Sequence, residues 1–65
     1  MNQTDRYILA GKFAGQLGHH EDAIKLFSEG LEHNPAEPRL LRHRGHRFIT
    51  LRRFEDARDD LTRAA

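Results

Sequence analysis

The run GHHEDAIKLFSEGLEHNP, from Gly18 to Pro35, decides the fold of this chain. Its apolar and small residues recur at three- and four-residue steps, which places them on one face of a helix. These residues are Ala23, Ile24, Phe27, Gly30 and Leu31. Gly18 stands before the helix as a turn residue, and Asn34-Pro35 ends it because proline disfavours helical geometry in the residue before it. The run therefore predicts an amphipathic helix over residues 21–33.

The same pattern returns 34 residues further along the chain. Glu21-Asp22-Ala23 has its counterpart in Glu55-Asp56-Ala57, and Gly11 has its counterpart in Gly45. A period in this range is typical of stacked helical repeats, in which one helix pair cannot bury its apolar face alone. The spacing predicts a single domain over 1–65, with one repeat over 4–37 and a second, truncated repeat over 38–65.

Three further helices complete the two units, over about 5–17, 38–51 and 54 to the end. Thr4 or Asp5 is available as the first N-cap, and Pro38 suits a first helical turn. Gly18 ends the first helix in the left-handed C-cap position. No period-two alternation and no Asn-Gly or Asp-Gly turn indicates a strand. We therefore expect an all-α fold of four helices, built as two stacked antiparallel helix-turn-helix repeats.

Small residues in the helices predict close crossings within each pair. Gly11 and Gly45 lie in helix interiors, where glycine costs roughly 1 kcal/mol relative to alanine. That cost is tolerated where a neighbouring helix approaches too closely for a β-carbon. Ala23 and Ala57 are expected at the same crossings, with large side chains filling the space between.

Composition excludes several classes of function. The 65 residues include no cysteine, so we expect neither disulfides nor thiolate metal sites, and five histidines alone do not predict a metal centre. No stretch approaches the roughly 20 apolar residues of a membrane span, and the first residues lack the features of a signal peptide. No nucleophile motif or phosphate-binding loop is present. We expect a cytoplasmic protein that is not an enzyme, has no cofactor and does not enter a membrane.

These repeats resemble the tetratricopeptide repeat family. With the first unit starting at Thr4, the matching positions are Tyr7, Gly11, Gly18, Ala23, Phe27, Gly30 and Pro35. In the second unit, from Pro38, they are Gly45, Phe48, Phe54, Ala57 and Ala64. The departures are Ala14, Leu41, Arg44 and Arg52, the last standing for a turn glycine. The resemblance implies an α-solenoid fragment that acts as a protein–protein interaction scaffold.

In proteins similar to this family, the first helices of successive repeats line a concave groove for a peptide or a partner helix. The corresponding positions here are Asp5, Ile8, Lys12, Gly15, Gln16, Arg39, Arg42, His46, Ile49 and Thr50. Among them, the expected partner contacts are Lys12, Gln16, Arg39, Arg42 and His46. Because arginine binds carboxylates through two hydrogen bonds, the expected ligand class is an acidic peptide or a C-terminal carboxylate. The alternative is a solvated face whose arginines pair with acids on neighbouring helices.

Nucleic-acid binding is a second hypothesis. The segment from Arg39 to Arg53 holds six arginines and no acid, which could contact phosphates. At 100° per residue, however, these arginines spread around their helix, and acidic helices flank them. Nucleic acid is therefore the weaker expectation.

Two repeats are fewer than the three or so that a solenoid normally needs. The second repeat stops before its closing proline, so we expect an uncapped apolar end face that includes Phe48, Ile49 and, in part, Leu61. Two interpretations are open. The chain is the N-terminal part of a longer repeat array, which we favour, or it self-associates as a homo-oligomer through the uncapped C-terminal end.

Overall fold

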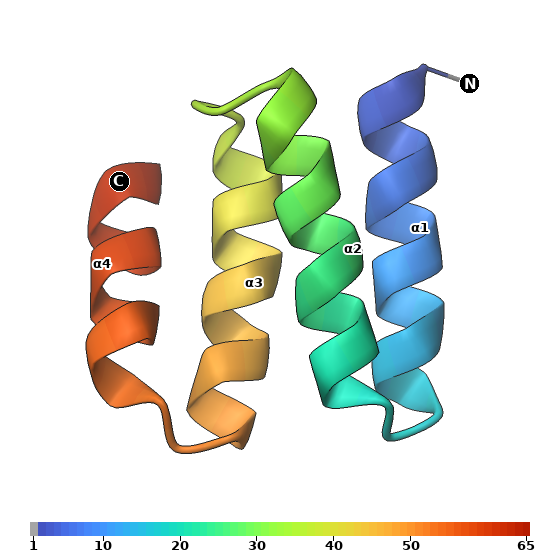
Figure 1. Cartoon of the computed structure of the whole chain (residues 1–65). Coiled ribbons are helices and arrows are strands. Elements are labelled where there is room, and N and C mark those ends of the chain that lie inside the picture. Colours follow the sequence, from blue (N-terminus) through green and yellow to red (C-terminus); the bar gives the residue numbers. More distant parts are fainter. Residues whose placement is uncertain (1) are drawn as a thin grey trace.

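The computed structural model describes residues 2–65, and these form four helices without a strand. The helices are α1 (Gln3–Gln16), α2 (His20–His33), α3 (Pro38–Thr50) and α4 (Phe54–Ala64). They lie side by side in chain order, so that α1 and α4 form the two edges of the molecule (Figure 1). Each helix packs on its neighbour in sequence, and α1 also touches α3. The predicted all-α fold of two helix pairs is confirmed.

The first helix begins earlier than expected. Asn2 is its N-cap, and the Asn2 side chain accepts a hydrogen bond of 2.8 Å from the backbone N–H of Asp5. The prediction of Thr4 or Asp5 at this position is wrong, because asparagine caps a helix as well as either. The earlier start also places Asp5 in the first turn, where its carboxylate faces the positive end of the helix.

The turns between the helices of each pair have the same backbone. Gly18 has a φ of 81° and Arg52, 34 positions later, has a φ of 60°. In both turns the next residue donates its N–H to a carbonyl five positions back, His19 to Ala14 at 2.9 Å and Arg53 to Phe48 at 2.8 Å. This is the Schellman arrangement, which normally uses glycine in the left-handed position. The second turn keeps the geometry although its residue carries a β-carbon.

The core is shared between the two hairpins. One cluster joins α1, α2 and the start of α3, and its fully buried large side chains are Phe27, Leu40 and Leu41. A second cluster joins α2 to the other hairpin through Ile24, Phe48 and Ala57. Since α2 and α3 contribute to both clusters, the contact between the hairpins is continuous with the packing inside each.

Helix crossings are as close as the small residues predict. A β-carbon on Gly11 would overlap the ring of Phe27, and one on Gly45 would lie 2.9 Å from Cδ2 of Leu61. Each large side chain comes from the other helix of the pair, 16 positions further along the chain. The glycines therefore serve close packing between helices.

A buried ion pair links the helices of the second hairpin. Nε and Nη2 of Arg44 each donate a 2.7 Å hydrogen bond to the carboxylate of Asp60, which is only 3% exposed. Nη1 of Arg44 donates a third bond, of 3.0 Å, to Oγ of Ser28 on α2. Because both carboxylate oxygens are bound, the charge of Asp60 is compensated inside the protein.

The expected apolar end face is only partly present. Phe48 is buried against Ile24, and Leu61 is half-buried, so neither forms an open face, whereas Ile49 is exposed. The prediction is wrong for Phe48 because its side chain turns toward α2 instead of toward the end of the stack. Within residues 2–65, the longest run of exposed apolar side chains lies instead on α1, at the other edge.

Membrane insertion finds no support in the helices. Among the residues that the structure describes, none of the helices has the length and apolar character needed to cross a bilayer.

Candidate binding groove

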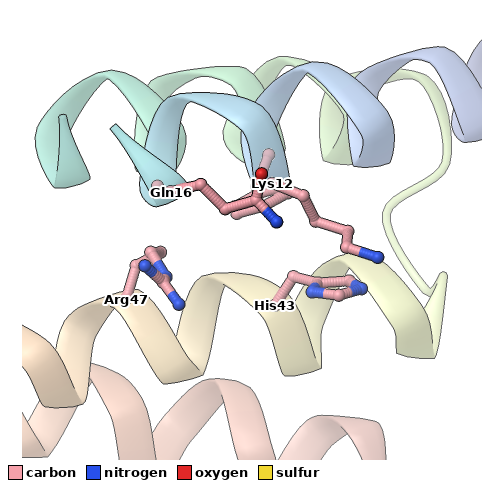
Figure 2. A pocket seen from close by; sticks show the side chains of 6 residues that line it. Lys12, Gln16, His43 and Arg47 are labelled. Carbon is pink, nitrogen blue, oxygen red and sulfur yellow. The ribbon is translucent and has the colours of Figure 1, made fainter. Parts of the chain in front are cut away.

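A groove of about 430 Å³ lies between α1 and α3. Its walls are Lys12, Gly15 and Gln16 from α1 and His43 and Arg47 from α3, and Phe27 of α2 closes it from below. Lys12 and Gln16 are four residues apart, as are His43 and Arg47, so each pair occupies one face of its helix on successive turns. Figure 2 shows the two pairs on opposite sides of the groove.

The groove is positively charged. Its lining contains the cations Lys12 and Arg47 and no acidic side chain. The pKa of His43 is lowered from its usual 6.5, first by burial and then by the nearby Lys12, His46, Arg42 and Arg47. The His43 ring is therefore neutral at neutral pH. A ligand meets two fixed positive charges beside an uncharged ring.

His43 is held in place by an aromatic contact. Its ring stacks on Phe27, with centroids 5.5 Å apart and an angle of 20° between the planes. Phe27 is buried in the main core cluster, so this contact joins the groove to the core of the fold. The arrangement gives the groove a flat apolar surface next to its charges.

Arg47 is fixed by residues from two other helices. Its Nη1 donates a 3.1 Å hydrogen bond to Nδ1 of His20 on α2. On α1, a β-carbon at Gly15 would lie 2.7 Å from the same Nη1, so Gly15 leaves space for the guanidinium. A half-buried arginine held in this way is oriented before a ligand arrives.

The structure brings together two of the five predicted contacts, Lys12 and Gln16. Arg42 and His46 are exposed on α3 and lie outside the lining of the groove. The predictions omitted Arg47. The four-residue step from His43 to Arg47 could have indicated it, since both side chains must share a face of the third helix.

Arg39 is already paired within the chain. Its Nη1 lies 3.0 Å from Oδ1 of Asp5, and its Nε lies 2.9 Å from Oε1 of Glu37. The hydrogen bond from the Arg39 side chain is also the main reason that the pKa of Glu37 is lowered. Arg39 thus joins the start of α1 to the start of α3 at one end of the groove.

Other arginines of the basic segment also bind acids of this chain. Three of its six arginines form such pairs. The alternative of a solvated face predicts pairs of this kind where they are exposed and join neighbouring helices. The pairs are Arg39–Asp5, Arg44–Asp60 and Arg53–Asp56. Arg53–Asp56 is a local pair and Arg44–Asp60 is buried, so the exposed pairs between helices are Arg39–Asp5 and Arg53–Glu21, the latter at 4.0 Å.

Two results complete the description of the groove. Within residues 2–65, no group of three or more histidine, aspartate or glutamate side chains is placed to hold a metal ion. No protein-family model, no curated protein and no solved structure matches this chain. The function of the groove is therefore inferred from its own geometry and charge.

Proposed function

We propose that this chain is a protein-binding module of the tetratricopeptide repeat type, and that its groove binds an acidic segment of a partner protein. The observation that carries the proposal is the pairing of Lys12 and Arg47 across a groove without any acidic lining residue. A peptide or helix with carboxylates spaced along one face would satisfy both charges. We also propose that the module acts in the cytoplasm.

The four polar side chains of the groove have different roles in this proposal. Arg47 is already oriented by His20, so it loses little freedom when it binds a carboxylate. Lys12 has a flexible stem and adapts to the position of a second acid. The amide of Gln16 can both donate and accept hydrogen bonds, which suits the backbone of an extended peptide.

Apolar contact supports the ionic contacts. The stacked rings of Phe27 and His43 offer a flat surface between the charged groups. An aliphatic or aromatic residue between two acids of the ligand would pack there. Each charged hydrogen bond contributes about 1.5–3 kcal/mol, so two of them supply about 3–6 kcal/mol, which corresponds to binding weaker than micromolar.

Arg42 and His46 act at longer range in this proposal. Both are exposed on α3 next to the groove, and Arg42 contributes positive potential without lining it. Such charges increase the rate of encounter more than the lifetime of the complex. Arg39 contributes less, because Asp5 and Glu37 already compensate its charge.

The test uses fluorescence anisotropy with a short labelled peptide in which glutamate alternates with leucine. We expect Lys12→Glu to weaken binding of this peptide at least about tenfold, since attraction is replaced by repulsion. Arg58→Glu is the matched control, because Arg58 is exposed on α4 and outside the groove. Its affinity should stay close to that of the parent chain. An unchanged affinity for Lys12→Glu would contradict the proposal.

A second peptide with glutamine in place of glutamate separates charge from shape. We expect it to bind much more weakly than the glutamate peptide. A single-stranded oligonucleotide serves as competitor and tests the nucleic-acid hypothesis. Displacement by the oligonucleotide that vanishes with added salt, combined with equal binding of the two peptides, would favour a phosphate ligand over an acidic peptide.

A further inference from the structure

The first helix exposes an apolar stripe that the groove does not use. Leu9, Phe13 and Leu17 are 58%, 62% and 57% exposed, and they recur at four-residue steps on one face of α1. Leu9 and Phe13 each precede a groove residue, Lys12 and Gln16, by three positions, so the stripe runs beside the groove wall of α1, about 60° around the helix from it. The stripe therefore adjoins the groove, although none of its residues lines it.

This stripe borders a second hollow, of about 470 Å³, between α1 and α2. Its apolar lining includes Ala10, Ala14 and Leu26 beside Phe13 and Leu17. Its rim is charged and is formed by His19, Asp22, Lys25 and Glu29. Large and small apolar residues thus alternate along one exposed edge, with acids and bases around it.

The second hairpin shows what fills such a hollow. Shifted by 34 residues, Ala10 corresponds to Arg44, Leu17 to Leu51 and Leu26 to Asp60. In the second hairpin these positions are partly or fully buried, and α2, which runs antiparallel to α3, lies against Arg44 and Leu51. Leu9 and Phe13 correspond to His43 and Arg47, which line the groove beside α1. The face around Ala10 and Leu17 is thus the part of the first hairpin that an antiparallel helix covers in the second, and the structure leaves it uncovered.

The last helix is a poor occupant for this face. If copies stacked end to end, α4 would take the place that α2 has on the second hairpin. The residues of α4 and its C-cap equivalent to Ile24, Ser28 and Leu31 are Arg58, Thr62 and Ala65, all of them exposed. These side chains cannot cover Leu9, Phe13 and Leu17 with apolar surface.

We propose that the occupant is α1 of a second copy of this chain, in a two-fold symmetric dimer. A two-fold axis across α1, between Ala10 and Phe13, makes the two helices antiparallel, as α2 and α3 are. It places Phe13 opposite the partner subunit's Ala10 and Leu9 opposite the partner subunit's Ala14. Large side chains then meet small ones from both sides, which is how helix faces interdigitate.

Charges at the ends of the stripe fit the same arrangement. Arg6 is exposed at the N-terminal end of the stripe, and Asp22 lies on the rim beyond its C-terminal end. In the antiparallel dimer, Arg6 approaches the partner subunit's Asp22, and the symmetry repeats the pair. Apolar packing and ion pairing therefore both favour the antiparallel orientation.

The test is molar mass by light scattering on a sizing column, with circular dichroism on the same fractions. We expect the full chain to reach twice its monomer mass of 7.6 kDa as its concentration rises. Phe13→Glu should give a helical monomer at every concentration. Phe54→Glu is the matched control, since Phe54 is 60% exposed on α4, and it should remain dimeric.

A charge swap tests the orientation. Arg6→Asp should weaken the dimer at low salt, and Arg6→Asp combined with Asp22→Arg should restore it. A parent chain that stays monomeric, or a dimer that survives Phe13→Glu, would overturn the proposal. So would masses that grow beyond the dimer, because they indicate end-to-end stacking. Failure of the double variant to recover would overturn the antiparallel arrangement.

Discussion

The two hairpins have the same turn geometry and the same small residues at their crossings, but they differ where each meets its neighbour. In the first hairpin, Ala10 and Leu26 form an apolar surface that is open. In the second, the same two positions hold Arg44 and Asp60, which are bound to each other under α2. The small residues that fold each hairpin are therefore the same in both hairpins, whereas the residues at which a hairpin meets its neighbour differ between them.

The largest expected effect comes from breaking the buried ion pair. Asp60→Ala leaves Arg44 without a carboxylate, and loss of one partner of a buried pair costs about 3–5 kcal/mol. A chain of this size has little more stability than that, so we expect it to unfold at room temperature. Circular dichroism with urea titration measures the effect.

The double variant Arg44→Met with Asp60→Leu sharpens this comparison, because it makes the second hairpin apolar like the first. We expect its stability to be equal to or higher than that of the parent chain. If the double variant lost as much stability as Asp60→Ala alone, the Arg44–Asp60 pair would stabilise the fold through more than charge compensation.

The crossings should respond unequally to an added methyl group. Gly11→Ala drives a β-carbon into the Phe27 ring, which cannot move because it is fully buried. We expect a loss of about 1–3 kcal/mol from overpacking, offset by less than about 1 kcal/mol of helix propensity. Gly45→Ala meets Leu61, which is half-buried and able to shift, so its net effect should be near zero. Thermal melts of the two variants measure which one loses more stability. Equal losses of stability would contradict the expected difference.

Exchanging residues between the turns should have smaller and opposite effects. Arg52 is in the left-handed region at a cost of about 1 kcal/mol that glycine does not have. We therefore expect Arg52→Gly to raise the free energy of unfolding by about that amount, and Gly18→Arg to lower it by as much. Guanidinium titrations of both variants measure the two changes in the free energy of unfolding. Destabilisation by Arg52→Gly would show that the arginine side chain makes up for its strain.

The smallest expected effect is a dependence on pH in the groove. The pKa of His43 is lowered in the folded chain, so below its ordinary value the unfolded chain binds a proton that the folded chain lacks. Stability should therefore fall as pH decreases from about 7 to about 5. His43→Phe keeps the ring on Phe27 and removes the titration, so its melting temperature should fall less over this range. An equal fall in both proteins would assign the effect to other groups.

Local rules predicted the helices and the turn geometry, because caps, prolines and apolar periodicity act within a few residues. The start of α1 at Asn2 was missed, since several good caps follow one another there. Lys12 and Gln16 were expected from the resemblance to the repeat family, and both line the groove. Arg44 could not be assigned to Asp60, because a long side chain chooses among many acids by three-dimensional packing. Of the end face expected at Phe48, Ile49 and Leu61, only Ile49 is exposed, since exposure depends on which neighbour covers each face.

The order of packing has a mechanical consequence. Among the described helices, contacts join only neighbours in the sequence and α1 to α3, and the two ends of the chain lie at opposite edges of the molecule (Figure 1). A force that pulls the ends apart is therefore shared at α1 between two helix interfaces, whereas at α4 it passes through the single interface with α3. We expect α4 to separate first when the chain is stretched.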